Sequence, residues 1–294
     1  MLKKIALIIF LPLIANFGQN GTASRSLTGV QKFLVSKSDL YLEINGEFPT
    51  TLQIYNARSG GMIEMPKSLV WTEADFTATA VYGYSNKINF FSTVPLRFVN
   101  HYSPDLIQAN KGFGDIELGG YYGFMKTKVD GFSLNGILSV VLPIGYNKNL
   151  DATELPLGDG AFMFRGGVTG NLIMDYGTII YSAEYLLKLK NSAGVNLGDI
   201  ISGSVSLENG FKVNGSSFTW ETGVILSEKL NDSNNGINLA NSSFFNGNLF
   251  AGIKYSYSDN IDFGLVIPYS VIKRDGWFTD YSINLQMNYL LESL

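Results

Sequence analysis

The sequence predicts an all-β protein, a transmembrane antiparallel up-and-down β-barrel of about 12 strands. Three observations favour this fold class. Apolar and polar residues alternate in one segment after another, short and long connections alternate between these segments, and charged residues fall almost entirely on one face of each segment. A strand with one apolar and one polar face, repeated around a closed sheet, places the apolar faces in lipid and the polar faces in an enclosed lumen.

The composition excludes several other classes of protein. Only 16% of the residues are charged, whereas 32 are Gly, 16 are Tyr and 20 are Phe, which is typical of an aromatic, turn-rich β protein. The absence of Cys excludes disulfides, a thiolate metal site and an N-terminal lipid-modified Cys. The net charge of -4 and the scattered Lys and Arg residues provide no basic patch, so we expect no nucleic-acid partner.

The N-terminus has the pattern of a signal peptide. Lys3 and Lys4 precede a short apolar core at residues 5–14, and small residues follow. This core is too short to cross a bilayer as a helix, which takes about 20 apolar residues. We therefore expect residues 1–18 to direct export and to be removed.

The alternation of apolar and polar residues begins near residue 38 and divides the remaining chain into two parts. Residues 19–37 are predicted to form an N-terminal periplasmic or plug segment, and residues 38–294 the barrel. No later stretch is long and apolar enough for a spanning helix. The predicted location is the outer membrane of a Gram-negative cell, with outer-membrane lipid and the barrel-assembly machinery as partners.

The clearest predicted strand is the last one, where Tyr281, Ile283 and Leu285 alternate with polar residues. Comparable segments recur along the chain and are slightly longer than the roughly 9 to 11 residues that a tilted strand needs to cross a bilayer. The predicted strands are 38–47, 70–84, 88–99, 113–125, 132–146, 161–174, 178–189, 200–211, 217–228, 247–258, 261–273 and 280–291.

The connections between these strands alternate in length. The short ones carry the Gly, Asn or Asp residues that tight turns require and lie at 85–87, 127–131, 175–177, 212–216 and 259–260. The long ones lie at 48–69, 100–112, 147–160, 190–199, 229–246 and 274–279. Bacterial barrels place short turns at the periplasmic side and long loops outside. This pattern predicts both termini on the periplasmic side.

The apolar face of the strands is predicted to contact lipid, because almost no charge interrupts it and a charge there costs roughly 2 to 4 kcal/mol at the bilayer midplane. Tyr and Trp near strand ends fit aromatic girdles. Residues predicted to point outward include Phe76, Tyr82, Tyr84, Leu118, Tyr122, Leu138, Val140, Tyr185, Leu226, Leu249, Phe263 and Leu285.

The opposite face carries the charged residues, which could not lie unpaired in a dry core. The candidate residues of the lumen and its constriction are Arg97, Arg165, Lys188, Lys254, Asp115, Glu117, Glu184 and Glu221. In one interpretation they select solutes along an open path. In the other, cations such as Arg97 and Arg165 pair with groups such as Asp115 and Glu117 and stiffen a filled barrel. A barrel of about 12 strands is intermediate between a packed interior and an aqueous channel.

Three short motifs resemble a known family. They are Gly-Phe-Gly-Asp-Ile-Glu-Leu-Gly at 112–119, Leu-Pro-Ile-Gly at 142–145 and Leu-Gly-Asp-Gly at 157–160. With them the central half of the chain resembles the outer-membrane family named after the meta-pathway of phenol degradation, which is similar to FadL-type channels for hydrophobic compounds. The resemblance implies uptake of small hydrophobic or aromatic molecules. The chain departs from FadL-type channels in its predicted strand number and lacks their Asn-Pro-Ala motif.

Apolar residues in the long loops are a second candidate site. They either pack the loops on each other or form a landing site for an apolar solute. These candidates for outer-loop ligand contact are Met62, Ile63, Leu106, Ile107, Phe244 and Phe245.

The sequence favours no enzyme and no cofactor. The single histidine, His101, adjoins Ser103 and Asp105 in a loop, and neighbouring loop residues seldom form a catalytic triad. The polar stretch 231–236 has alternating oxygen ligands without the closing Glu of a calcium loop, so we expect no metal site there. The predicted function is passive uptake of small molecules. A structural or adhesive barrel with a closed lumen is the alternative, and an embedded hydrolase comes third.

Overall fold

The computed structural model describes residues 34–49, 52–56, 61–64, 70–102, 107–126, 131–145, 154–191, 194–239, 242–274, 277–279 and 281–292, a few of them by their backbone alone. The strands of the barrel are β1 (Leu40–Pro49), β4 (Val70–Ser85), β5 (Ile88–Tyr102), β7 (Ile116–Lys126), β8 (Phe132–Leu142), β9 (Met163–Met174), β10 (Gly177–Lys188), β11 (Ile200–Val213), β12 (Ser216–Lys229), β15 (Phe244–Ser256), β16 (Ile261–Arg274) and β18 (Ser282–Leu291).

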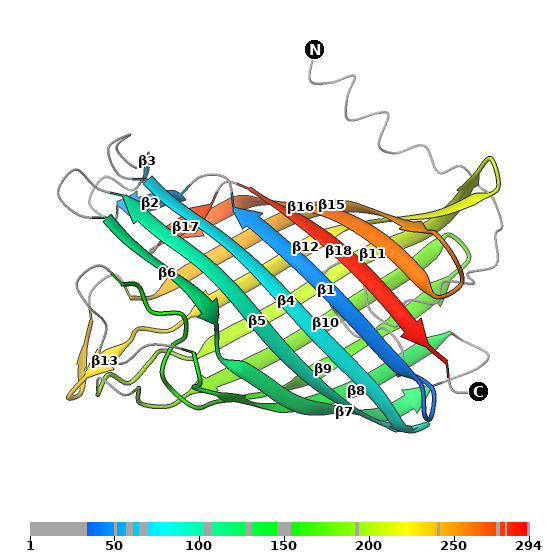
Figure 1. Ribbon diagram of the computed structural model, residues 1–294, viewed down its shortest axis with the longest axis horizontal. Helices are drawn as coiled ribbons and strands as arrows, with labels where there is room; N and C mark the ends of the chain where they lie inside the picture. The colour runs from blue at the N-terminus through cyan, green and yellow to red at the C-terminus, as the bar shows by residue number, and fades with distance from the viewer. Residues whose placement is uncertain are drawn as a thin grey trace, which may run out of the picture.

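These strands close into one antiparallel barrel, which confirms the predicted fold class (Figure 1). Each pairs with its neighbours along the chain, and the first strand, β1, pairs with the last, β18. The pairing of β4 with β5 completes the circle. Within the described part of the chain, no helix is long and apolar enough to cross a membrane.

Short turns join the strands at one end of the barrel, as predicted. Between β11 and β12, Val213 pairs with Ser216 and leaves a two-residue loop of Asn214 and Gly215. Both residues have positive φ angles, 50° and 85°, which is the conformation of a type I′ hairpin turn. The described N-terminal residues and the end of β18 lie at this same end (Figure 1).

The long connections at the other end contain further strands. They are β2 (Leu52–Asn56), β3 (Gly61–Glu64), β6 (Ile107–Phe113), β13 (Ser233–Asn234), β14 (Ile237–Asn238) and β17 (Trp277–Thr279). The strands β2, β3 and β17 form a small sheet of their own, and β13 pairs with β14.

The prediction of a long loop at 100–112 was wrong. The strand β5 continues to Tyr102. The strand β6 pairs with the outer half of β5, where Leu96 lies opposite Phe113 and Tyr102 lies opposite Ile107. The side chains of β6 alternate between exposed and partly buried, a period-two pattern that its polar composition hides. The predicted strand 132–146 also ends early, at Leu142, because the next residue, Pro143, has no N–H for the ladder.

The two faces of the barrel wall agree with the predicted assignment. Large apolar side chains such as Leu138 and Leu285 lie on the outer surface, where they are 72% and 51% exposed. Charged side chains such as Glu221, Lys254 and Asp262 are buried on the inner face. A one-residue register slip would exchange these sets, so the alternation fixes the register.

An epitope tag distinguishes the two ends of the barrel. A tag inserted between Asn235 and Gly236, in the hairpin of β13 and β14, is expected to be labelled by antibody on intact cells. A tag in the β9–β10 turn at Asp175 is expected to be labelled only after permeabilisation, because short turns face the periplasm. The reverse labelling would show that the barrel is inserted the other way round.

Candidate functional site

Arg97 is held on the lumenal face by two carboxylates from the neighbouring strand. It forms ion pairs with Glu73 and Asp75 of β4, and its Nε lies 3.1 Å from Oδ1 of Asp75. The pairing register places Asp75 directly opposite Arg97. Arg97 also donates from Nη1 to the carbonyl oxygen of Leu157 at 3.3 Å. Of the groups that the structural interpretation named as partners, Asp115 is not among the described contacts of Arg97.

Arg165 on β9 lies between two other carboxylates. Its Nε is 3.2 Å from Glu117 on β7, and its Nη1 is 3.2 Å from Glu184 on β10. Ser139 on β8 donates to Glu117 at 2.5 Å. These contacts tie four consecutive strands of the wall together. The predicted lumenal residues Arg165, Glu117 and Glu184 thus meet in one cluster.

A third polar cluster lies on the opposite wall. Lys254 is 3% exposed, and its Nζ lies 3.9 Å from Glu208, while Glu221 is 1% exposed and accepts a hydrogen bond from Ser206 at 2.7 Å. In the described structure, Oδ1 of Asp262 and Oε1 of Gln286 are buried without a hydrogen-bond partner. Such groups are costly in a dry interior, so this wall suits a hydrated lumen.

The connection between β8 and β9 folds back onto the inner face of the barrel. Its residues 154–161, which we call the constriction segment, place Leu155 and Leu157 against Val99 of β5. The side-chain amide of Asn110 on β6 donates to the carbonyl oxygen of Leu155 at 2.7 Å. Since Leu157 is 2% exposed, this segment is packed against the lumenal wall and not extended away from it.

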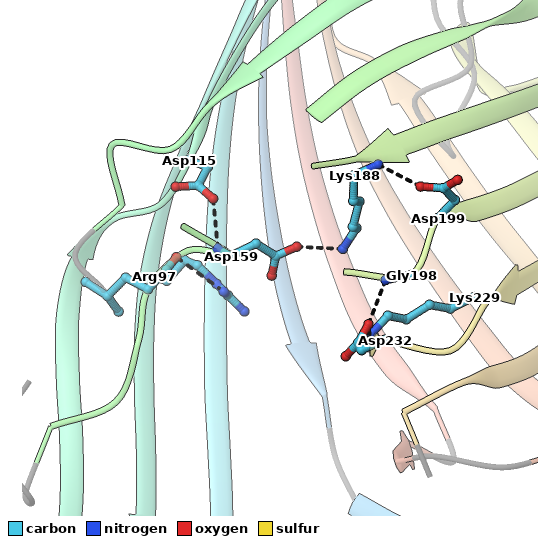
Figure 2. Close-up of polar contacts among 9 residues, drawn as sticks. Arg97, Asp115, Asp159, Lys188, Gly198, Asp199, Lys229 and Asp232 are labelled. Carbon is cyan, nitrogen blue, oxygen red and sulfur yellow. Dashed lines mark hydrogen bonds and ion pairs between the residues drawn. The ribbon is translucent and has the colours of Figure 1, made fainter. Parts of the chain in front are cut away.

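The constriction segment is anchored to two separate parts of the barrel wall (Figure 2). Asp115, between β6 and β7, accepts hydrogen bonds from the backbone N–H groups of Gly145 at 2.9 Å and Asp159 at 2.8 Å. The carboxylate of Asp159 reaches Nζ of Lys188 on β10 at 2.5 Å. Asp115 and Lys188, both predicted lumenal residues, are therefore joined through Asp159.

The same line of polar contacts continues beyond Lys188. The backbone N–H of Lys188 donates to Asp199 at 2.9 Å, and the N–H of Gly198 donates to Asp232 at 2.7 Å (Figure 2). Asp232 in turn forms an ion pair with Lys229 at 2.8 Å. A chain of contacts thus runs along the outer end of the barrel, from the connection between β6 and β7 to the connection that follows β12. Within the stretch 231–236, Asp232 is occupied by these contacts and Asn235 and Gly236 form a tight turn.

The other end of the lumen holds residues 34–38, which we call the N-terminal segment. Val35 donates its N–H to Oδ1 of Asn89 at 2.8 Å, and Nδ2 of Asn89 donates to the carbonyl oxygen of Val35 at 2.9 Å. Ser38 donates to the carbonyl oxygen of Gly83 at 2.6 Å. The segment is therefore bound to the inner face of β4 and β5 by its backbone.

Val35 fills an apolar cage formed by side chains that point into the lumen. The buried members of this cage are Tyr41, Val81, Phe91, Tyr121 and Ile137. The rings of Phe91 and Tyr121 lie 4.9 Å apart. Sequence analysis missed this cage, although doublets such as Phe90–Phe91 and Tyr121–Tyr122 break the strict alternation of the strands and mark the positions where the lumen turns apolar.

The candidate residues of the outer loops do not form one site in the described structure. Ile107 is exposed on the outer side of β6, whereas Phe245 lies on β15, far around the barrel, with the guanidinium of Arg274 5.8 Å above its ring. Phe244 is partly buried beside Phe245. The side chains of Met62, Ile63 and His101, and all of Leu106, lie outside the described residues.

Comparison with known proteins supports the fold. No family model matches the chain, and no curated protein matches it in sequence. The structure is similar to an outer membrane channel from Pseudomonas putida F1, with a TM-score of 0.72 and 12% identity over 88% of this chain and 97% of that one. It is also similar to the translocator domain of the autotransporter NalP from Neisseria meningitidis, with a TM-score of 0.52 and 10% identity over 86% and 89% of the two chains. The chain has the fold of a bacterial outer-membrane barrel.

Proposed function

We propose that this protein is an outer-membrane channel for the passive uptake of small hydrophobic or aromatic molecules. The observation that carries this proposal is the presence of two apolar clusters inside an otherwise polar lumen. One apolar cluster lies at the constriction segment, where Leu155 and Leu157 meet Val99. The other is the cage around Val35 at the opposite end. Once the segment that covers such a cluster moves away from the wall, a solute gains roughly 25 cal/mol for each Å² of apolar surface that it buries there.

The charged residues have a different part in this proposal. Because Arg97 and Arg165 are each paired with two carboxylates, each cluster has one positive against two negative groups and presents no positive field to the path. Arg97 and Lys188 instead hold the constriction segment through Leu157 and Asp159. Passage then requires this segment and the N-terminal segment to move away from the wall. The similar fold of an outer membrane channel supports the proposal.

A structural or adhesive barrel with a closed lumen is the second candidate function. The observation that favours it is the extent of filling, since two segments pack inside the wall and Arg165 of β9 forms ion pairs with carboxylates on β7 and β10. In that case the pairs stiffen the barrel and no solute crosses it.

Replacing Lys188 by methionine tests the proposed channel. The change removes the ion pair with Asp159 and should loosen the constriction segment. An ion pair of this exposure contributes up to about 1 kcal/mol, so we expect uptake to rise roughly twofold to fivefold. The measurement is uptake of the fluorescent aromatic N-phenyl-1-naphthylamine by intact Gram-negative cells that express each protein.

Lys190→Met is the matched control, because Lys190 is exposed and forms no described ion pair. It should leave uptake at the level of the unaltered protein. If neither the unaltered barrel nor Lys188→Met raises uptake above that of cells without the barrel, the closed structural barrel is the correct assignment.

A further inference from the structure

A cleft of about 780 Å³ opens on the outside of the barrel beside the β4–β5 turn. Its walls come from two sources. Lys37 and Ser38 belong to the chain where it leaves the lumen, and Tyr82, Tyr84, Lys87 and Tyr122 belong to the wall and its turn. The cleft is large enough for a small ligand, since binding pockets are typically about 300 to 1,000 Å³.

The position of the cleft coincides with the edge of the lipid-facing surface. Tyr82, Tyr84 and Tyr122 point outward and are 44%, 59% and 46% exposed, and the ring of Tyr84 packs 5.6 Å from that of Phe90. Tyrosines at the end of a lipid-facing belt mark the level of lipid headgroups. Because the turn belongs to the short-turn end of the barrel, this level is that of the periplasmic leaflet.

The charge of the cleft is positive. Lys37 and Lys87 are both exposed, and neither forms an ion pair with another described residue. No acidic residue is among the described residues that line the cleft. The turn that presents Lys87 is ordered by Ser85, whose hydroxyl oxygen accepts hydrogen bonds from the N–H groups of Lys87 at 3.3 Å and Ile88 at 3.1 Å.

We propose that this cleft binds the headgroup of an anionic phospholipid from the periplasmic leaflet. The phosphate lies between Lys37 and Lys87, and the glycerol and upper chains lie along the tyrosines. The lipid thereby bridges the barrel wall and the chain that leads into the N-terminal segment, which is anchored at Ser38 and Gly83. A bound lipid therefore stabilises the inserted position of that segment.

The test is native mass spectrometry of the full-length protein in detergent, titrated with phosphatidylglycerol or with phosphatidylcholine. The unaltered protein should retain phosphatidylglycerol in preference to phosphatidylcholine. Each lysine near an anionic headgroup contributes about 1 kcal/mol, so Lys37→Gln combined with Lys87→Gln should weaken phosphatidylglycerol binding about 10- to 30-fold.

The control is Lys111→Gln combined with Lys212→Gln, which removes the same charge from two exposed positions outside the cleft. It should bind phosphatidylglycerol as the unaltered protein does. Equal losses in the two double variants, no loss in either, or equal binding of the two lipids by the unaltered protein would each overturn the proposal. Since all four lysines are exposed, both double variants should fold, which heat-dependent migration of the barrel in gels verifies.

Discussion

Gly83→Val is expected to expel the N-terminal segment and to leave the short-turn end of the lumen open. A Cβ atom at position 83 would lie 1.8 Å from the carbonyl oxygen of Ser36 and 2.9 Å from the carbonyl oxygen of Val35. Loss of the buried Val35 side chain and its hydrogen bonds to Asn89 removes roughly 2 to 6 kcal/mol. The population without the inserted segment should therefore rise at least about 30-fold. The measurement is single-channel conductance in a planar bilayer, which should be higher for Gly83→Val than for the unaltered protein.

Two further variants make that result specific. Gly210→Val adds the same side chain to the lumenal face of β11, where the nearest atom to the new Cβ is 3.6 Å away, so conductance should not change. Asn89→Leu removes both hydrogen bonds to Val35 while keeping the branched shape and the number of heavy atoms of the side chain, and should also raise conductance. If Gly83→Val and Asn89→Leu, each combined with Lys188→Met to loosen the constriction segment, conduct no more than Gly210→Val combined with Lys188→Met, the N-terminal segment does not close the lumen.

Leu285→Arg should strongly impair insertion of the barrel. Leu285 is 51% exposed on the outer face of β18, so the change places a charge in lipid at a cost of roughly 2 to 4 kcal/mol. Gln286→Arg, the adjacent substitution, places the same charge in the lumen, where Asp262 is buried without a partner for its Oδ1 atom. It should insert with nearly normal yield.

The measurement is the fraction of folded barrel recovered from outer-membrane preparations of cells that express each variant. Equal recovery of Leu285→Arg and Gln286→Arg would show that the assigned faces of β18 are wrong. The pair is informative because the two positions share a strand and differ only in the face that they occupy.

The barrel wall was predictable because its determinants are local. Period-two alternation, as at Tyr281, Ile283 and Leu285, depends only on residues within one strand, and a turn such as Asn214–Gly215 depends on two adjacent residues. Strand ends were less predictable, since β6 has a polar sequence and is a strand only because β5 extends to pair with it.

The interior of the barrel was less predictable because its contacts join distant parts of the chain. Asn89 binds a backbone 54 positions away, and Arg97 contacts Leu157 60 positions away. Neither contact leaves a periodic pattern in the sequence. The polar face identified Arg97, Arg165 and Lys188 as lumenal, but their partners follow from the pairing register and from the path of one loop.

The pairing of β1 with β18 constrains the order in which the molecule can assemble. Leu40 pairs with Leu291, so the seam joins the start of the first barrel strand to the end of the last one. The other wall contacts join strands that are neighbours along the chain and can form early, because short loops close at little entropic cost. The seam can form only when the final strand has arrived. Until then both edges of a nearly complete sheet have unpaired backbone groups and are vulnerable to aggregation.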